Sequence, residues 1–363
     1  MKTWIEEPGF PLVIVKEERK CFNSELTITQ EKFSGDTCQH EKSPMWIIPI
    51  AILVSTCVCK PVDKVLLDEF SKKITLTDLK CDDYIVINPQ CIGYYKVQYQ
   101  EEMLVAFRQT LRYLRFPLIE RLGVISDAYS LTVSGKKSME QFLGLLRYYT
   151  HETNYLSLKH IDNCIIDDIY RCISGSECTK DFDKFVHDLF SPVRRKLIKW
   201  NPDPEEDIFK PALRSLFYIR FMKLGDGVAR QEALSRQENL QINSKPLHPD
   251  ISEICYTALA LDTNVNSMEK LIRIYKKTEN NDEKSRILSS MGKVTDSKIM
   301  DMVLEFMTSE DVQPKDFLII LKNLTDTDAG RNASWCYFVK NRQMFLDKCQ
   351  EDVVRFLVKL SLP

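Results

Sequence analysis

The spacing of apolar residues divides the chain near Gln100. Before this point, short β-branched runs alternate with turn residues, which is typical of strands. Turns such as Ser34-Gly35-Asp36 and Asn88-Pro89 separate the runs. We expect strands over residues 11–16, 25–33, 46–54, 65–70, 74–76, 84–87 and 93–99. Several short strands at regular spacing predict a small Ig-like antiparallel β-sandwich.

After Gln100 the apolar residues recur at helical spacing, as Met103, Phe107, Leu111 and Leu114 do before Pro117. No comparable strand pattern returns. We expect helices over residues 103–114, 119–133, 138–149, 161–172, 178–199, 207–224, 227–237, 251–261, 266–277, 281–291, 297–307, 313–324, 329–348 and 352–360. Many helices joined by short loops, without a repeat of fixed length, predict an irregular α-solenoid of helical hairpins.

The last amphipathic run, residues 352–360, includes Val353 and Leu357 and is followed by Pro363. A solenoid normally closes with a polar capping helix. Because this run looks like a helix in need of a neighbour, we expect the array to be C-terminally incomplete. The predicted organisation is an interdomain lead-in over residues 1–12, a β-sandwich domain over 13–99 and a truncated helical solenoid domain over 100–363.

Charge and cysteine content narrow the class of protein. The net charge of −2 gives no footprint for nucleic acid or for an anionic membrane. The longest apolar run, residues 46–58, is too short to span a bilayer, and the first residues have no secretory pattern. We therefore expect a cytoplasmic protein without membrane or nucleic-acid partners, whose twelve cysteines are free thiols. The pairs Cys57/Cys59 and Cys172/Cys178 lack partners at zinc-site spacing.

Several short motifs occur along the first part of the chain in a characteristic order. The motifs are Trp4 before Gly9-Phe10-Pro11, Gln30-Glu31-Lys32-Phe33, Trp46-Ile47-Ile48-Pro49-Ile50, Gly93-Tyr94-Tyr95-Lys96-Val97-Gln98-Tyr99, and Arg121, Asp127, Tyr129, Leu131 and Gly135. In this order they resemble the carboxy-terminal half of the gluzincin zinc aminopeptidases, a β-sandwich followed by a helical domain of the ERAP1 carboxy-terminal type. Lys96 stands where the family usually has arginine, which keeps the charge but loses the bidentate fork.

Further stretches resemble the puromycin-sensitive branch of this family. They are Phe190-Ser191-Pro192-Val193, Trp200-Asn201-Pro202, Glu283-Lys284-Ser285-Arg286-Ile287, Ser309-Glu310-Asp311-Val312-Gln313-Pro314, and Gly330-Arg331 with Ala333 and Trp335. The resemblance implies a part in removing amino-terminal residues from peptides. It also implies two partners, the peptides themselves and the catalytic zinc-domain portion of the enzyme.

The family's zinc site needs His-Glu-x-x-His, and its grip on the substrate needs Gly-x-Met-Glu-Asn. Neither occurs in this sequence. The nearest match, His151-Glu152-Thr153-Asn154-Tyr155, has tyrosine at the second ligand position. We therefore expect no catalytic, cofactor-binding or metal-binding residue here, although intact family members hold zinc. The chain is expected to be inactive alone, either as the substrate-enclosing part of the enzyme or as a free-standing peptide- or protein-binding module that uses a concave solenoid face.

Individual residues carry further expectations. Trp46 and Phe33 are expected in the sandwich core. Arg121 and Asp127 are expected to form an ion pair between helices, because residues six apart do not share a helix face. Arg331 is the one candidate for a peptide-cavity contact, because its planar fork suits a substrate carboxylate. The alternative for Arg331 is an ordinary solvated helix arginine.

Overall fold

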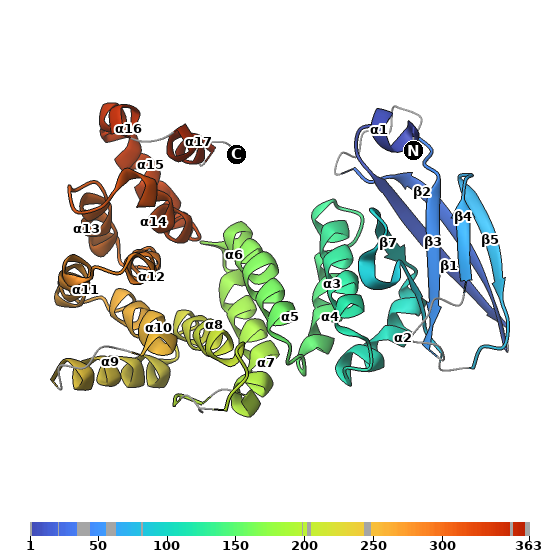
Figure 1. Cartoon of the computed structure of the whole chain (residues 1–363), viewed down its shortest axis with the longest axis horizontal. Helices are drawn as coiled ribbons and strands as arrows, with labels where there is room; N and C mark the ends of the chain where they lie inside the picture. The colour runs from blue at the N-terminus through green and yellow to red at the C-terminus, as the bar shows by residue number, and fades with distance from the viewer. Residues whose placement is uncertain are drawn as a thin grey trace. The chain divides into compact units, whose positions relative to one another are not determined.

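A computed structural model describes residues 2–20, 22–34, 44–55, 63–80, 83–197, 199–201, 205–242, 248–348 and 351–359. The chain divides into two compact units, Met1–Leu158 and Lys159–Pro363. Strands and the first helices belong to the first unit, and a longer series of helices belongs to the second (Figure 1). The architecture is the predicted one, a β-sandwich followed by a helical array. The division of domains after Tyr99 stays a prediction.

Two sheets form the sandwich. One has the strand order β5-β2-β1-β7 and the other the order β4-β3-β6. A short helix α1 (Lys2–Glu6) precedes the strands. The strands are β1 (Pro11–Lys20), β2 (Asn23–Lys32), β3 (Ile48–Val54), β4 (Asp63–Leu67), β5 (Ser71–Leu76), β6 (Ile85–Ile87) and β7 (Lys96–Tyr99). Each predicted strand is confirmed, with shifts of a few residues at its ends.

The sandwich is not wholly antiparallel. Strand β7 pairs with β1 in parallel, with Val13 beside Val97 and Val15 beside Tyr99. This corrects the antiparallel prediction, and the reason is topological: the last strand enters the sheet beside the first, after the chain has crossed both sheets. The core follows from period-two alternation, since Leu26 and Ile28 are buried while their neighbours are more exposed.

A buried amide joins the loop before β3 to β2. The Gln30 side chain accepts a hydrogen bond from the Trp46 backbone nitrogen at 2.8 Å and donates one to the Trp46 carbonyl at 2.8 Å. Trp46 is fully buried, which confirms its place in the core. Phe33 is only half-buried and stacks on Phe10, with ring centroids 5.1 Å apart. Two of the sequence motifs are therefore structural elements of the sandwich.

Helices α2 (Glu101–Arg112), α3 (Leu118–Val133) and α4 (Met139–Leu146) complete the first unit. Pro117 separates α2 from α3, as predicted, because it cannot continue a helix. A capping box begins α4: Ser138 accepts from the Gln141 backbone nitrogen, and the Gln141 side chain accepts from that of Ser138.

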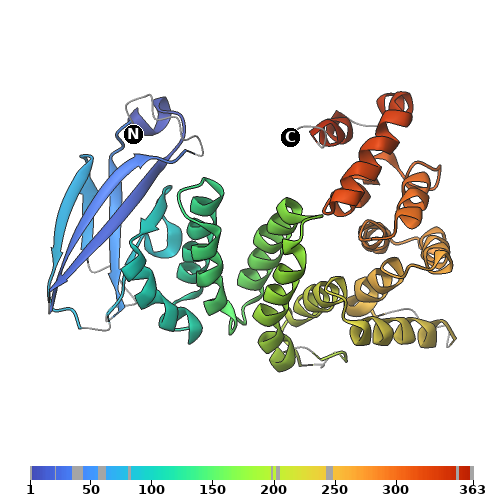
Figure 2. The same ribbon diagram turned by 180° about the vertical axis from the view of Figure 1, so that it is seen from behind.

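The second unit is a series of helices that follows a curved path (Figures 1 and 2). It contains the π-helix η4 (His160–Ile166), preceded by α5 (Tyr155–Lys159) at the unit boundary. The helices are α6 (Asp167–Ile173), α7 (Cys178–Leu197), α8 (Lys210–Lys223), α9 (Gly227–Ile242), α10 (Pro249–Ala260), α11 (Val265–Lys277), α12 (Asn281–Met291), α13 (Ser297–Met307), α14 (Phe317–Leu324), α15 (Asp328–Lys340), α16 (Arg342–Lys348) and α17 (Glu351–Lys359). Helix α10 packs against both α8 and α12, which continues the stacking along the array.

Three details differ from the sequence-based expectation. The run predicted over residues 161–172 contains a π-helix, and the run over 329–348 breaks at Asn341 into α15 and α16. In α17, Val353 and Leu357 are buried in the core formed with α10 to α16. The expectation that the last helix has no neighbour is therefore wrong for these two side chains.

Candidate functional site

A cavity of about 230 Å³ lies within the second unit. Its walls come from α6, α7 and α8 on one side and from the α12–α13 and α14–α15 connections on the other. Charged side chains of both signs line it: Asp167, Asp183, Arg220, Lys223, Lys293 and Asp326. The volume is well above the roughly 10–15 Å³ that one water needs and below the roughly 300–1,000 Å³ of drug-sized sites.

Arg220 on α8 is the most buried charge on the wall, with 4% of its side chain exposed. Its Nε donates to Asp162 at 2.6 Å, and its Nη2 donates to Asp167. Burial alone would lower the pKa of Arg220, but attraction to Asp162 and Asp167 outweighs it and raises the pKa. Asp162 belongs to the π-helix, so this local widening of the helix supplies one of the two carboxylates that fix the guanidinium.

Lys223, one turn further along α8, is less well compensated. Its nearest carboxylate is Asp326 on the α14–α15 connection, 3.9 Å from Nζ, and 26% of the side chain remains exposed. Burial, together with repulsion from Arg220, lowers the pKa of Lys223. The same environment raises the pKa of Asp326 through burial, although Lys223 partly offsets this.

Asp183 on α7 places a negative charge on the wall of the cavity, opposite in sign to that of Lys223. The Tyr170 hydroxyl donates to Asp183 Oδ1 at 2.6 Å. Within the part of the chain that the structure describes, Asp183 has no cationic partner. Burial raises the pKa of Tyr170, and its hydrogen bond to Asp183 raises it further, so the phenol stays protonated and holds this carboxylate in place.

The wall of the cavity closes where the α6–α7 turn meets the α14–α15 turn. Arg171 Nε lies 3.4 Å from Asp326 Oδ1, and the Asp328 backbone nitrogen donates to Ser174 Oγ at 2.9 Å. Arg331 on α15 joins the same junction, since its guanidinium donates to the carbonyls of Thr325 and Arg171, both at 3.2 Å. Arg331 Nη2 also lies 3.5 Å from Asp328 Oδ1. Arg331 thus lies beside the cavity with two backbone carbonyls and one carboxylate as partners, and a contact with peptide stays a prediction.

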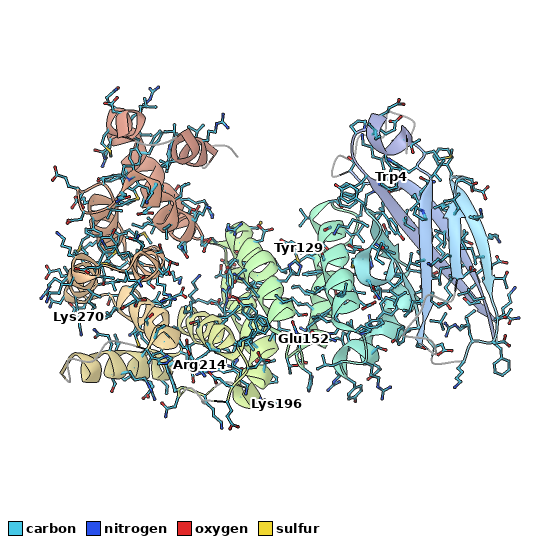
Figure 3. The ribbon with its side chains drawn as sticks, in the orientation of Figure 1. Trp4, Tyr129, Glu152, Lys196, Arg214 and Lys270 are labelled. Carbon is cyan, nitrogen blue, oxygen red and sulfur yellow. The ribbon has the colours of Figure 1, made fainter. Side chains whose placement is uncertain are left out.

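The His-Glu pair lies in the first unit and has a structural environment. Residues 152–154 lie outside any helix, and the side chain of Glu152, which is labelled in Figure 3, is fully buried. Glu152 Oε2 accepts from Arg121 Nε at 2.7 Å, and Oε1 accepts from Arg121 Nη2 at 3.1 Å. Oε1 also accepts from the backbone nitrogens of Thr153 and Asn154, both at 2.9 Å. These contacts occupy the carboxylate with protein donors.

The predicted ion pair between Arg121 and Asp127 is wrong. Arg121 pairs with Glu152, and Asp127 pairs with Lys96, whose Nζ lies 3.0 Å from Asp127 Oδ1. Asp127 Oδ2 also accepts from the Val97 backbone nitrogen at 3.0 Å, which ties α3 to strand β7. Two residues of one motif therefore stabilise different junctions, and the Lys96 ammonium donates to both Asp127 and Ser126.

Metal ligands do not assemble in the described part of the chain, where no group of three His, Cys, Asp or Glu residues could hold a metal ion. The stretch at His151 does not fit zinc, because it is not helical and Glu152 is held by Arg121. The cysteines whose side chains are described are free thiols: Cys91, Cys172, Cys178, Cys255 and Cys336. Cys57 and Cys59 lie outside the described residues.

Among the described helices, none has the length and apolar character needed to cross a membrane.

The charged cavity was not predicted from the sequence. Asp183, Lys223 and Asp326 each lie on a helix or turn with many other charges, and nothing in their local spacing sets them apart. The motif Gly330-Arg331 lies next to the cavity, and Arg331 was the one residue of this region that the sequence marked as a candidate for ligand contact. Gly330 is explained by packing, since a Cβ at this position would lie 1.8 Å from the Leu324 carbonyl oxygen.

Comparison with known proteins gives a consistent result. A family model described as the ERAP1-like C-terminal domain matches residues 84–363. The chain is 26% identical to Aminopeptidase M1-B of Oryza sativa subsp. japonica, covering 94% of this chain and 39% of that protein. It is 24% identical to the Puromycin-sensitive aminopeptidase of Caenorhabditis elegans, covering 96% and 37%, and 25% identical to Aminopeptidase M1 of Arabidopsis thaliana, covering 92% and 39%. The chain spans about two fifths of the length of these curated relatives.

Proposed function

Because the chain belongs to the ERAP1-like C-terminal domain family, we propose that it serves as the substrate-enclosing, regulatory part of a zinc aminopeptidase of the puromycin-sensitive type. One observation carries this proposal. Proteins named as aminopeptidases match more than nine tenths of this chain but only about two fifths of their own length. The chain therefore corresponds to their carboxy-terminal part. In this proposal, the zinc chemistry belongs to the part of those proteins that the chain does not match.

In this proposal the two units have separate tasks. The sandwich unit is a rigid support, held by the Gln30–Trp46 and Arg121–Glu152 contacts. The helical array supplies the wall that encloses peptides and selects them by length. Zinc, when bound by the catalytic portion, would activate the water that attacks the peptide. The partners are thus peptides and the catalytic portion, and the proposed location is the cytoplasm.

The experiment compares the chain alone with the chain supplied with a catalytic portion. The purified chain is assayed for bound zinc and for cleavage of an aminoacyl fluorogenic substrate, and the part of the Caenorhabditis elegans relative that this chain does not match is then added. We expect no turnover from the chain alone, and co-purification with a change in peptide cleavage after addition. Stoichiometric zinc with chelator-sensitive turnover by the chain alone would overturn the proposal. Peptide binding without any association with the catalytic portion would instead favour the free-standing binding module.

Arg331 is tested in the reconstituted mixture. If Arg331 receives a substrate carboxylate, Arg331→Ala should weaken the dependence of cleavage on peptide length, whereas Arg331→Lys should retain part of it. Arg273 on α11 is an exposed arginine whose one ion-pair partner among the described residues is Glu269, four residues away, so Arg273→Ala is the matched control. An unchanged length dependence in Arg331→Ala would rule out the cavity contact.

A further inference from the structure

The cavity of the helical unit presents two charges of opposite sign that the surrounding protein leaves under-compensated. Of the six charged residues on its wall, Asp167 is held by Arg220, and Lys293 Nζ lies 2.9 Å from Glu253 Oε1. Asp326 is shared between Arg171 and Lys223. Among the described residues, the Asp183 carboxylate has no cationic partner, and the Lys223 ammonium has only the shared Asp326 carboxylate, 3.9 Å away.

We propose that this cavity binds a small zwitterion, with its ammonium group at Asp183 and its carboxylate at Lys223. The shared chemistry is an α-ammonium and an α-carboxylate on one molecule, as in a free amino acid or a very short peptide. This site goes beyond the proposed function and does not rest on it, because it lies wholly within one unit of this chain.

The balance of charge argues for a zwitterion over a simple ion. The wall carries three acidic residues, Asp167, Asp183 and Asp326, and three basic residues, Arg220, Lys223 and Lys293. A ligand with a single charge would be attracted by one of Asp183 and Lys223 and repelled by the other. A ligand that is neutral overall but carries both charges leaves the balance unchanged and compensates the two groups that need it.

The site is also preorganised. The Tyr170 hydroxyl fixes Asp183 at 2.6 Å, and the Arg220 guanidinium lies 5.6 Å from the centre of the Tyr170 ring. Arg220 is itself held by Asp162 and Asp167, so neither side chain has to reorder when a ligand enters. Only Lys223 is loosely held, and it can exchange its 3.9 Å contact with Asp326 for a direct contact with a ligand carboxylate. Small rearrangement favours affinity, because binding then orders few side chains.

The size of the cavity limits the ligand. About 230 Å³ gives room for a group of several waters, and a small molecule can replace them. Leu224, Leu261 and Val294 line the same space and offer apolar contact to a side chain. The cavity therefore suits an amino acid with a small or medium apolar side chain, or a dipeptide of small residues, better than a longer peptide.

The test is direct binding to the purified chain, measured by isothermal titration at millimolar ligand. The probes are L-alanine, L-leucine, Ala-Ala and Ala-Ala-Ala, with N-acetyl-L-leucine lacking the ammonium, L-leucinamide lacking the carboxylate, and acetate as a simple anion. We expect one of the zwitterions to bind, and both singly charged leucine analogues to bind roughly ten- to a hundredfold more weakly than the zwitterion. The amino acid and peptide arms distinguish the two sources of this chemistry.

Variants locate the site. Asp183→Asn keeps the acceptor for Tyr170 but removes the charge, and Lys223→Met keeps the stem but removes the ammonium; each should weaken binding about tenfold or more. Asp188→Asn and Lys184→Met, at exposed positions of the same helix α7, are the matched controls and should bind as the unmodified chain does. The proposal is overturned if no zwitterion binds, if acetate binds as tightly as the zwitterion, or if both cavity variants bind unchanged. Because the analogue series uses the unmodified chain, it decides the question even if a variant fails to fold.

Discussion

The buried ion pair between Arg121 and Glu152 should contribute strongly to the stability of the first unit. The perturbation is Glu152→Gln, which keeps the size of the side chain and removes its charge. The Glu152 side chain is fully buried and that of Arg121 is 9% exposed. An amide oxygen at the Oε1 position could still accept from Arg121 Nη2, Thr153 and Asn154, but the amide nitrogen would then face Arg121 Nε, which is also a donor.

The magnitude follows from this geometry. Removing one partner of a buried ion pair costs about 3–5 kcal/mol, because the other charge stays buried without compensation. Gln retains three of the four acceptor contacts, so we expect the lower end, about 3 kcal/mol, for Glu152→Gln and the upper end for Glu152→Ala. For a unit of this size, about 3 kcal/mol corresponds to a fall in Tm of roughly 6–12 °C.

The assay must report the first unit separately, because a chain of two units need not unfold in one step. Amide hydrogen exchange of α3 and of the turn at residues 152–154 gives the local free energy of opening, and urea denaturation gives the global value. Glu101→Gln is the matched control, since the Glu101–Arg108 pair is exposed at 43% and 36% and should contribute less than about 1 kcal/mol. A cycle with Arg121→Met and the double variant isolates the coupling between the two side chains.

Two results would contradict a stabilising ion pair at this position. One is a cost for Glu152→Gln no larger than that for Glu101→Gln. The other is a coupling energy near zero in the cycle, which would show that Arg121 and Glu152 contribute independently. The expected result gives Glu152 a structural role and explains why a His-Glu pair occurs here without a metal ligand set.

Three further outcomes are expected, each measurable by chemical or thermal denaturation. Gly330→Ala should destabilise the array by more than about 1 kcal/mol, because the added Cβ would overlap the Leu324 carbonyl oxygen. Gly144→Ala is the control: it adds a Cβ into open space on a helix and should be neutral or stabilising by about 0.5–1 kcal/mol. Equal effects of the two variants would contradict the packing argument. Ser138→Ala should cost about 1 kcal/mol through loss of the capping box of α4, and no change in Tm would argue against it. Burial lowers the folded-state pKa of Lys223 below its unfolded value, so the unfolded chain holds this proton more tightly and stability should rise with pH up to the ordinary lysine pKa of about 10.4. Lys223→Met should remove this part of the rise, and an unchanged pH profile would refute it.

Much of the fold could be predicted because it rests on local periodicity. Alternation in residues such as Leu26 and Ile28 marks strands, and helical spacing in Met103, Phe107 and Leu111 marks α2. The parallel pairing of β7 with β1 could not be predicted this way, because strand alternation is the same in parallel and antiparallel sheets. The break at Asn341 was missed because the amphipathic pattern runs through it.

The contacts of charged residues were harder to predict for a physical reason. Arg121 had several carboxylates within reach in sequence, and only the path of the chain after α4 brings Glu152 to it instead of Asp127. The cavity draws Asp183, Lys223 and Asp326 from separate helices and turns, and each looks locally like a solvated surface charge. The spacing of residues along one helix does not predict contacts between side chains on different helices.

The junction between the α6–α7 turn and the α14–α15 turn has a consequence for how the helical unit folds. In an open solenoid each helix meets mainly its neighbours in sequence, so folding can start at many places and spread quickly. Here, Ser174 bonds to Asp328, 154 residues later, and Arg171 accepts from Arg331, 160 residues later. Closing such a long loop in an unfolded chain costs more conformational entropy than these few hydrogen bonds recover, so the junction is stable only after the intervening helices have formed. We therefore expect this junction to form last during folding and to exchange its amide protons first, while α10 and α12 protect theirs longest.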